Sequence, residues 1–178
     1  MKKTSDCKSN DRVTGAGRGL KLQNSFCECT ENMKAYKVAT HRHTSEIEQE
    51  LSNVAGEEIM ISFTPHLIPQ KRGILSTIYV NLNRKSSAEE LTEMYKEFYK
   101  DEFFVRVKEV GDLPETKHVA GSNFVDIGVC YDERLQRAVV VSSLDNIVKG
   151  AAGQAVQNMN LLFGLDEKTA LTNPGFYL

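Results

Sequence analysis

The sequence predicts an α+β domain in which a mixed, largely antiparallel sheet is covered by about three helices. Short runs rich in β-branched and aromatic residues recur along the chain, and three segments carry apolar residues at helical spacing. The chain has 178 residues, of which 40% are hydrophobic and 26% are charged, as in one globular domain. A sheet of this kind can leave one face open to a partner.

Residues 1–35 show little periodicity and are expected to form an irregular lead-in to a domain that spans residues 36–178. The lead-in contains the glycine-rich segment Gly15–Gly19. This segment lacks the Gly-x-Gly-x-x-Gly spacing of a dinucleotide fingerprint, and no strand is expected before it. It is therefore interpreted as a plain loop.

The first helix is expected to begin at Ser45 and to end at Gly56. Ser45 and Glu48 fit a capping box, and a glycine commonly follows the last turn of a helix. The apolar residues that recur at helical spacing are Ile47, Leu51 and Val54. The pattern therefore predicts a short amphipathic helix.

The remaining elements follow from the same two patterns. Strands are expected over residues 59–63, 74–82, 103–107, 123–131 and 138–145. The proline-bearing segment 64–73 is expected to be a loop between the first two strands. A second helix is expected over 86–101, with Ser87 and Glu90 as a capping box, and a last helix over 151–163, ended by Gly164.

Charge and composition exclude several classes of protein. The net charge is −2, and residues 1–45 hold nine Lys and Arg against four Asp and Glu, far short of a nucleic-acid footprint. No apolar run approaches the roughly 20 residues that span a bilayer, and no signal peptide is recognisable. The cysteines are sparse, at positions 7, 27, 29 and 130, and are expected to be reduced thiols. We therefore expect a cytoplasmic protein without a nucleic-acid or membrane partner.

Four long segments carry a resemblance to a known family. They are HRHTSEIEQEL (41–51), FTPHLIPQKRGILSTIYV (63–80), GSNFVDIGV (121–129) and DNIVKGAAGQAVQNMNLLFGLDEKTAL (145–171). From about Asp6 onward the chain resembles the N-acetyl-γ-glutamyl-phosphate reductases. This resemblance implies the NADPH-dependent reduction of N-acetyl-γ-glutamyl phosphate to N-acetylglutamate 5-semialdehyde in arginine biosynthesis. It also implies the fold of the C-terminal domain of enzymes similar to glyceraldehyde-3-phosphate dehydrogenase.

The resemblance also implies that part of the machinery lies elsewhere. Family members carry an N-terminal Rossmann domain and a catalytic cysteine in a Gly-Cys-Tyr-Pro-Thr motif, and neither is present in this sequence. Cys7 stands at an alanine position of the family and is therefore not interpreted as the nucleophile. We expect this chain alone to be inactive, with NADPH bound mostly by the absent domain.

Candidate catalytic and substrate-binding residues follow from the resemblance. His41 matches the catalytic histidine, and an imidazole suits proton transfer near neutral pH. Glu46 is expected to orient the imidazole, as a carboxylate on a ring nitrogen does. Arg42 and Arg72 are expected to bind an anionic group of the substrate. Weaker substrate-binding candidates are His66, Lys8 and Ser9.

The last helix is expected to meet the cofactor. By resemblance, the residues near the dinucleotide are Gly150, Ala151, Gly153 and Asn158. Free backbone N–H groups at a helix start favour a phosphate or carbonyl oxygen, and small residues permit close approach. Tight helix packing explains the same small residues equally well.

Other interpretations remain open at this stage. His41, Arg42 and His43 could be polar residues that decorate a helix entry, and for His43 the structural role is favoured. Cys27-x-Cys29 with His41-x-His43 offers four zinc-type ligands, but the single-residue gaps argue against a metal site. Alternatively, the chain is an inactive, truncated interaction module. In either case a homo-oligomer formed through the sheet face is expected.

Overall fold

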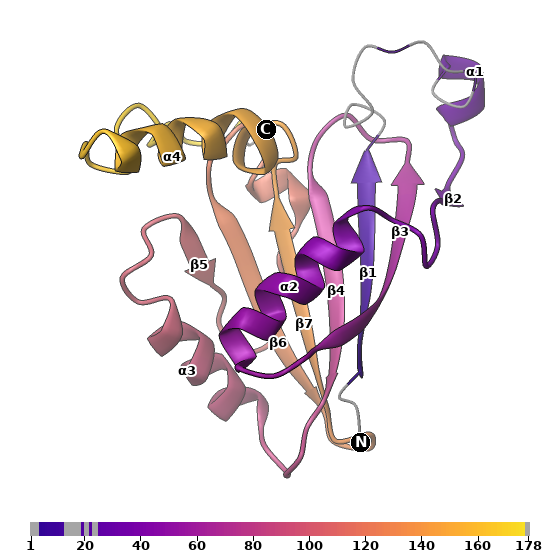
Figure 1. The fold of residues 1–178 in the computed structure, drawn as a ribbon, viewed down its shortest axis with the longest axis vertical. Coiled ribbons are helices and arrows are strands. Elements are labelled where there is room, and N and C mark those ends of the chain that lie inside the picture. Colours follow the sequence, from indigo (N-terminus) through magenta and orange to yellow (C-terminus); the bar gives the residue numbers. More distant parts are fainter. Residues whose placement is uncertain (1–3, 13–18, 20–21, 23–24, 177–178) are drawn as a thin grey trace.

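A computed structural model describes residues 4–12, 19, 22 and 25–176, which form one α+β unit around a seven-stranded mixed sheet. The strand order is β2-β3-β1-β4-β7-β6-β5 (Figure 1). The strands are β1 (Thr4–Arg12), β2 (Lys34–Ala35), β3 (Met60–Ile68), β4 (Ile74–Asn81), β5 (Val105–Val107), β6 (Val125–Asp132) and β7 (Arg137–Leu144). Pairs β1·β3 and β5·β6 are parallel, and the other four are antiparallel. The predicted fold class is confirmed.

The expected irregular lead-in is wrong for residues 4–12, which form β1. This strand lies between β3 and β4 and pairs with both. Its sequence, TSDCKSNDR, contains no aliphatic or aromatic residue, so propensity gave no signal of a strand. Backbone hydrogen bonding to two neighbours holds it in place instead. The segment Gly15–Gly19 lies outside the described residues, apart from Gly19.

The three expected helices are present in the described part of the chain. They are α2 (His43–Ala55), α3 (Ala88–Phe98) and α4 (Gly153–Leu162), and a four-residue helix, α1 (Phe26–Cys29), precedes them. A 3₁₀ turn, η3 (Thr116–His118), and a π-helical turn, η4 (Val148–Ala152), complete the set. The Ser87 cap of α3 is confirmed, since its Oγ accepts the Glu90 N–H at 3.1 Å. No described helix is long and apolar enough to cross a membrane.

The capping box predicted at Ser45 is wrong. Helix α2 begins two residues earlier, at His43, and its N-cap residue Arg42 makes no side-chain cap. The Ser45 hydroxyl donates to the carbonyl oxygen of Arg42 at 3.3 Å. The Glu48 carboxylate accepts the backbone N–H of Ile61 in β3 at 3.1 Å and so ties the helix to the sheet. The predicted end at Gly56 is confirmed by its left-handed φ of 68°.

The predicted loop 64–73 is also corrected. Strand β3 continues to Ile68, and Pro65 lies within it, opposite Ser9 of β1. The Pro65 carbonyl oxygen accepts the N–H of Tyr36 at 3.1 Å. The proline ring therefore does not interrupt the backbone hydrogen bonding of β3 on this side. The connection to β4 is therefore only the short turn 69–73, which ends at Gly73 with a φ of 99°.

The main core lies between α3 and one face of the sheet. Its buried members are Leu91, Ile127, Val129, Ala138 and Val140. Phe63, Cys7, Ile78, Val140 and Val129 are successive partners across the strands, so their side chains share this face. Helix α2 lies in front of the same face in Figure 1.

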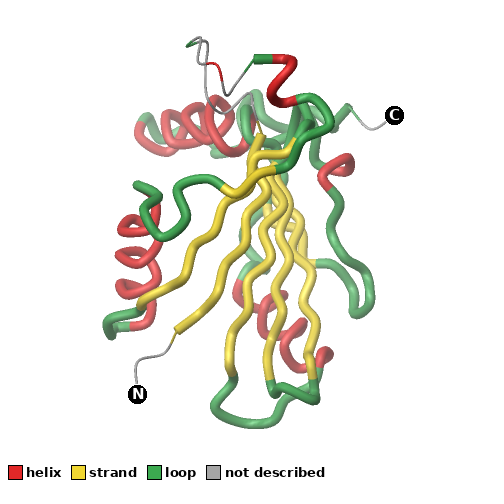
Figure 2. Tube along the Cα trace, turned by 90° about the vertical axis from the view of Figure 1, so that its right-hand side faces the viewer, coloured by secondary structure: helices red, strands yellow, loops and turns green. Residues whose placement is uncertain are grey.

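The opposite face carries no helix from α1 to α4 over its central strands. At Gly128, a Cβ atom would lie 2.8 Å from Pro114 and 2.9 Å from the Asp112 carbonyl oxygen, so the segment before η3 covers β6 there. Figure 2 shows α2 on one side of the sheet and η3 on the other. Elsewhere on this face, half-buried residues of β4, β6 and β7 lie beside the buried Asp126 and Ser143.

Candidate functional site

His41 lies at the entry to α2, against the helix-covered face of the sheet. Its imidazole is half-buried and makes edge contacts with three rings. The centroid distances are 5.6 Å to Tyr36, 4.9 Å to His43 and 5.3 Å to Phe63. These contacts hold the ring between the chain that leaves β2 and the middle of β3. His41 is thus a positioned imidazole rather than a freely rotating surface side chain.

The backbone of His43 orients the His41 ring. Its N–H donates to Nδ1 of His41 at 3.2 Å. A neutral imidazole that accepts at Nδ1 carries its proton on Nε2. The expected orienting partner, Glu46, is an exposed residue in the first turn of α2, and the described hydrogen bonds and ion pairs do not join it to His41. The structure therefore replaces the predicted carboxylate with a backbone amide.

Cys7 and Ser9 lie on the same face as Phe63, in the neighbouring strand. Cys7 pairs with Phe63 across β1·β3 and with Ile78 across β1·β4. Burial raises the pKa of the Cys7 thiol to about 11. A thiol of this kind is not an activated nucleophile, because the thiolate is the reactive form. Ser9 is buried, and its Oγ accepts the hydroxyl of Ser76 at 3.3 Å.

We predict that Cys7 reacts slowly with iodoacetamide in the folded chain. At pH 8 a thiol with a pKa of about 11 is ionised in about one molecule per thousand, against about a quarter for an unperturbed thiol. Because Cys27 is exposed to solvent, it should be alkylated much faster than Cys7, as followed by peptide mass spectrometry. Denaturation should abolish the difference. Equal rates in the folded chain would show that Cys7 is activated.

Arg72 and Gly73, in the turn after β3, are held by the two residues that follow β7. Nη1 of Arg72 lies 3.4 Å from Oδ1 of Asp145, and the Gly73 N–H donates to Oδ1 of Asn146 at 2.9 Å. Arg72 is 45% exposed, whereas the Asp145 side chain is 0% exposed. The exposed part of the guanidinium can bind an anion. Sequence reasoning missed Asp145 and Asn146, although a polar pair between a strand and a helix is a usual start signal.

The start of the last helix differs from the prediction. The chain enters α4 through η4, and Oδ1 of Asp145 accepts the N–H groups of Ile147 and Val148 at 2.7 and 2.9 Å. These amides are therefore not free to bind a phosphate. A π-helical turn at this point is a feature that recurs at functional sites.

The four candidate cofactor residues have different surroundings. Gly150 and Ala151 are exposed. Gly153 is buried, and a Cβ there would lie 2.4 Å from Oδ1 of Asn123, which supports the tight-packing alternative for this glycine. Asn158 is exposed, and its Oδ1 accepts Nε2 of Gln154 at 3.0 Å. Gly150, Ala151 and Asn158 are exposed, although the Gly150 N–H already donates to the Asp145 carbonyl oxygen at 2.9 Å.

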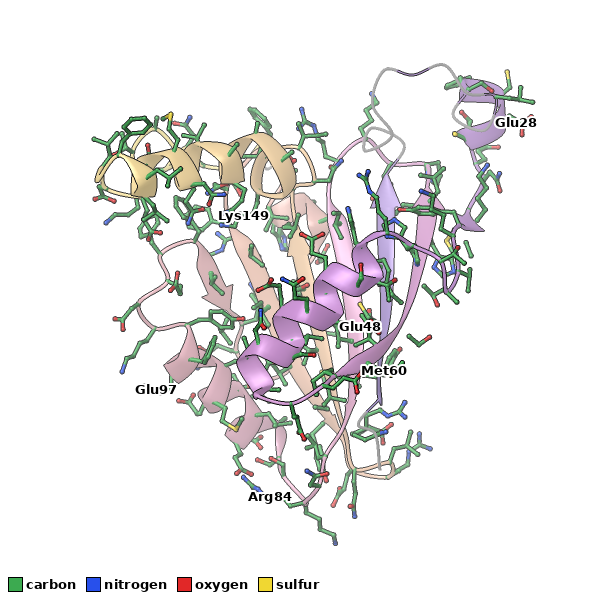
Figure 3. All side chains as sticks on the ribbon, in the orientation of Figure 1. Glu28, Glu48, Met60, Arg84, Glu97 and Lys149 are labelled. Carbon is green, nitrogen blue, oxygen red and sulfur yellow. The ribbon has the colours of Figure 1, made fainter. Side chains whose placement is uncertain are left out.

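The site candidates gather toward one end of the sheet. In Figure 1 the start of α2, the ends of β3 and β7 and the start of α4 all lie toward this end. β1 and β4 lie between β3 and β7, so His41, which packs on Phe63 of β3, and the start of η4, which follows β7, lie over different strands of the sheet. In Figure 3, Glu48 marks α2 and Lys149 marks the start of the last helix.

Not all candidates are brought together. His66 lies within β3 rather than in a loop, and its Nδ1 is 3.2 Å from the Thr64 carbonyl oxygen. Strand alternation turns it away from the face that carries Phe63 and His41. Arg42 is exposed at the N-cap of α2. Lys8 lies in β1, but its side chain is outside the described residues.

Two other places were candidates for ligands. The described residues contain no group of three or more His, Cys, Asp or Glu that could hold a metal ion, so Cys27, Cys29, His41 and His43 do not converge. A cleft of about 580 Å³ lies beside β5 and β6. Two ion pairs lie within its lining, since Arg106 donates to Asp126 at 2.6 Å and Lys108 lies 2.8 Å from Asp112. None of the predicted site residues lines it.

Comparisons with known proteins agree with the resemblance found in the sequence. An N-acetyl-gamma-glutamyl-phosphate reductase of Acetivibrio thermocellus is 65% identical over 166 residues, which cover 93% of this chain and 48% of that protein. The corresponding protein of Caldicellulosiruptor saccharolyticus is 56% identical over 169 residues, covering 95% and 49%. The chain thus spans about half the length of the curated relatives it matches.

Solved structures confirm the fold. Aspartate semialdehyde dehydrogenase II from Vibrio cholerae matches with a TM-score of 0.70 at 18% identity, over 91% of this chain and 55% of that chain. A probable aspartate-semialdehyde dehydrogenase from Pseudomonas aeruginosa gives 0.70 at 17%, over 90% and 55%. A family model described as the semialdehyde dehydrogenase dimerisation domain matches residues 2–146. This chain belongs to the semialdehyde dehydrogenase dimerisation domain family.

Proposed function

We propose that the chain is the part of an N-acetyl-γ-glutamyl-phosphate reductase that supplies a proton-transferring histidine and much of the substrate pocket. The observation that carries this is the His41 imidazole, which is fixed by three rings and one backbone amide. The relatives named as this reductase are 55–65% identical to the chain, which supports the substrate N-acetyl-γ-glutamyl phosphate. All four cysteines are free thiols, in keeping with a reducing, cytoplasmic compartment.

The proposed chemistry divides between this chain and the missing half. A thiolate from the missing half attacks the acyl carbon, and phosphate leaves. With its proton on Nε2, His41 donates a hydrogen bond to negative charge, either on the thiolate or on the oxygen that develops charge during attack. Proton abstraction by Nε2 would require the ring to give up its contact with the His43 N–H. The contact therefore favours the donor role.

Arg72 is proposed to bind the anionic end of the substrate, and Arg42 to assist from the entry of α2. A guanidinium presents parallel N–H groups that match a carboxylate or phosphate. The partial exposure of Arg72 and its anchorage to Asp145 support this role. Ser9 is proposed to lie nearer the substrate than His66, which faces away, and Lys8 stays a weaker candidate because strand alternation places it on the same face as His66. Glu46 is proposed to act on His41 only through the long-range electrostatic effect of its carboxylate.

NADPH is proposed as the cofactor, and when bound it supplies the hydride that reduces the thioester. The residues of this chain fit the uncharged end of a dinucleotide better than its phosphates. The reason is that Asp145 already accepts the N–H groups of Ile147 and Val148 at the entry to the last helix. Gly150 and Ala151 offer exposed backbone, and Asn158 offers an exposed amide that can pair with a carboxamide. The phosphates are assigned to the missing half.

We further propose that two copies pair through the open sheet face. Tyr79, Cys130, Val139 and Val141 are half-buried on this face, and the guanidinium of Arg137 lies 5.7 Å from the Tyr79 ring. A self-complementary apolar face of this kind suits a two-fold dimer. The matched family is described as a dimerisation domain, which supports the same assembly.

An activity assay tests the division of labour. NADP-dependent, phosphate-requiring oxidation of N-acetylglutamate 5-semialdehyde should be absent with this chain alone and present when the missing half is supplied. If activity never appears with both halves present and folded, the alternative of an inactive interaction module is supported. Activity from the chain alone would contradict the proposal that the nucleophile lies elsewhere.

A further inference from the structure

The carboxylate of Asp145 joins three segments that are distant in the sequence. Its Oδ2 accepts the Gly121 N–H at 2.7 Å, and its Oδ1 accepts the N–H groups of Ile147 and Val148. Oδ1 also lies 3.4 Å from Nη1 of Arg72. One side chain thus ties together the loop before β6, the turn after β3 and the entry to the last helix.

The contacts are consistent with a carboxylate that stays charged. Burial alone would raise the Asp145 pKa, but the N–H groups of Gly121, Val148 and Ile147, together with Arg72, hold it below its ordinary value of 3.8. A buried charge of this kind is tolerated only where its hydrogen bonds are made. Full occupation of both oxygens therefore fixes the side chain in one orientation.

The orientation of Asp145 is transmitted to the turn after β3. The next residue, Asn146, accepts the Gly73 N–H, so the turn is held at two successive points. Only one corner of the Arg72 guanidinium is engaged by Asp145, and a guanidinium has five N–H donors. The contact with Asp145 can therefore orient the planar guanidinium of Arg72. The outer N–H groups of the guanidinium can still donate to an anion.

We propose that Asp145 is a positioning residue, which fixes the Arg72 guanidinium relative to the start of the last helix so that the substrate anion and the hydride donor meet in register. This inference rests on the proposed function, in which Arg72 binds the substrate anion. The Asp145 side chain is fully buried, so it is proposed to act through Arg72 and not by direct contact.

A matched control exists in the same sheet. Asp126 of β6 is 1% exposed and pairs with Arg106, which is 45% exposed, as Arg72 is. Its described partner is Arg106 of the neighbouring strand β5, and it has no described contact with Arg72 or the last helix. Asp126→Asn should therefore reproduce the loss of a buried ion pair without disturbing the site.

The kinetic test uses an intact reductase that carries this domain. Asp145→Asn is expected to raise the KM for the acyl phosphate by about tenfold, the usual scale for one charge-assisted hydrogen bond, with a much smaller change in kcat. Asp126→Asn should leave both unchanged at a temperature where the enzyme is folded. In an Arg72→Gln background, Asp145→Asn should have little further effect on KM, because its influence acts through Arg72.

The outcomes separate the inference from the function on which it rests. If Arg72→Gln alone leaves the KM unchanged, Arg72 does not bind the substrate, and the inference falls together with that part of the proposed function. If Arg72→Gln raises the KM but the effect of Asp145→Asn adds to it in full, only the positioning role is overturned. Equal KM effects of the Asp126 and Asp145 variants would also overturn it.

Two further measurements test the inference, and the first does not require Asp145→Asn to fold. Arg72→Lys keeps the charge but not the fork, and it should raise the KM to a similar extent; an unchanged KM would overturn the need for a positioned guanidinium. In the 178-residue chain, amide exchange at Gly121, Ile147 and Val148 should accelerate in Asp145→Asn and not in Asp126→Asn. Unchanged exchange at all three amides would show that the Asp145 carboxylate does not hold these segments together.

Discussion

Replacing His41 by alanine in an intact reductase that carries this domain is expected to lower turnover by about 10²–10⁴-fold, the usual contribution of a positioned acid–base group. The Nε2–H proposed to face developing charge would be lost, whereas the groups proposed to bind the dinucleotide would remain. NADPH binding should therefore change little. Steady-state kinetics together with a fluorescence titration of NADPH would measure both effects.

The matched control is His43→Ala. The His43 ring contacts that of His41, but the group that orients His41 is the backbone N–H of residue 43, which alanine retains. Turnover should then stay within a few-fold of the unsubstituted enzyme. Should His41→Ala keep its full rate, or should both variants lose turnover equally, the assignment of His41 would be wrong.

Phe104→Ala is expected to destabilise the folded chain by about 3–5 kcal/mol, as for other large core aromatics. Phe104 is 1% exposed and packs in a cluster with Phe103 and Phe124, at centroid distances of 5.1 and 5.6 Å. The Lys149 ammonium lies 5.4 Å from its ring, so the cluster also supports the start of the last helix. Urea denaturation would measure the free energy of unfolding.

The control for the Phe104→Ala substitution is Phe98→Ala, at the end of α3. Phe98 is 71% exposed, so the same truncation removes little buried surface and should cost less than about 1 kcal/mol. Similar losses from the two variants would mean that Phe98 is covered in solution. Such a result would place a partner on the face that carries α3.

The periodic elements could be predicted from the sequence because their patterns are local. Helix α3 shows both an apolar stripe and the Ser87 cap, and strands β4, β6 and β7 are rich in β-branched residues. Burial of one face enforces such patterns, so they can be recognised without knowledge of the fold.

Other features depend on contacts between distant segments and left no local signal. Strand β1 is polar, and only its two neighbours make it a strand. The continuation of β3 past Pro65 depends on pairing with β1 and β2. The start of α2 is set without a side-chain cap, so a capping signature at Ser45 predicted the wrong boundary.

The candidate site shows the same division. The sequence segment around His41 singles this residue out as a candidate. The group that orients its ring is a backbone N–H, which no sequence pattern displays. The contacts of Asp145 could not be predicted from the sequence either, since its partners are residues 72, 121, 147 and 148. The amides of Ile147 and Val148, just before the predicted start of the last helix, are occupied by this carboxylate.

The pH dependence of alkylation of the proposed catalytic cysteine, which is assigned to the part of the reductase that this chain does not span, tests the central claim most directly. In an intact reductase, iodoacetamide should react with that thiol at lower pH when His41 is present, because its Nε2–H stabilises the thiolate. In His41→Ala the midpoint of the rate profile should move up by about one pH unit or more, as for loss of a charge-assisted hydrogen bond. Superimposable profiles for the two proteins would contradict the proposed partnership between His41 and the sulfur.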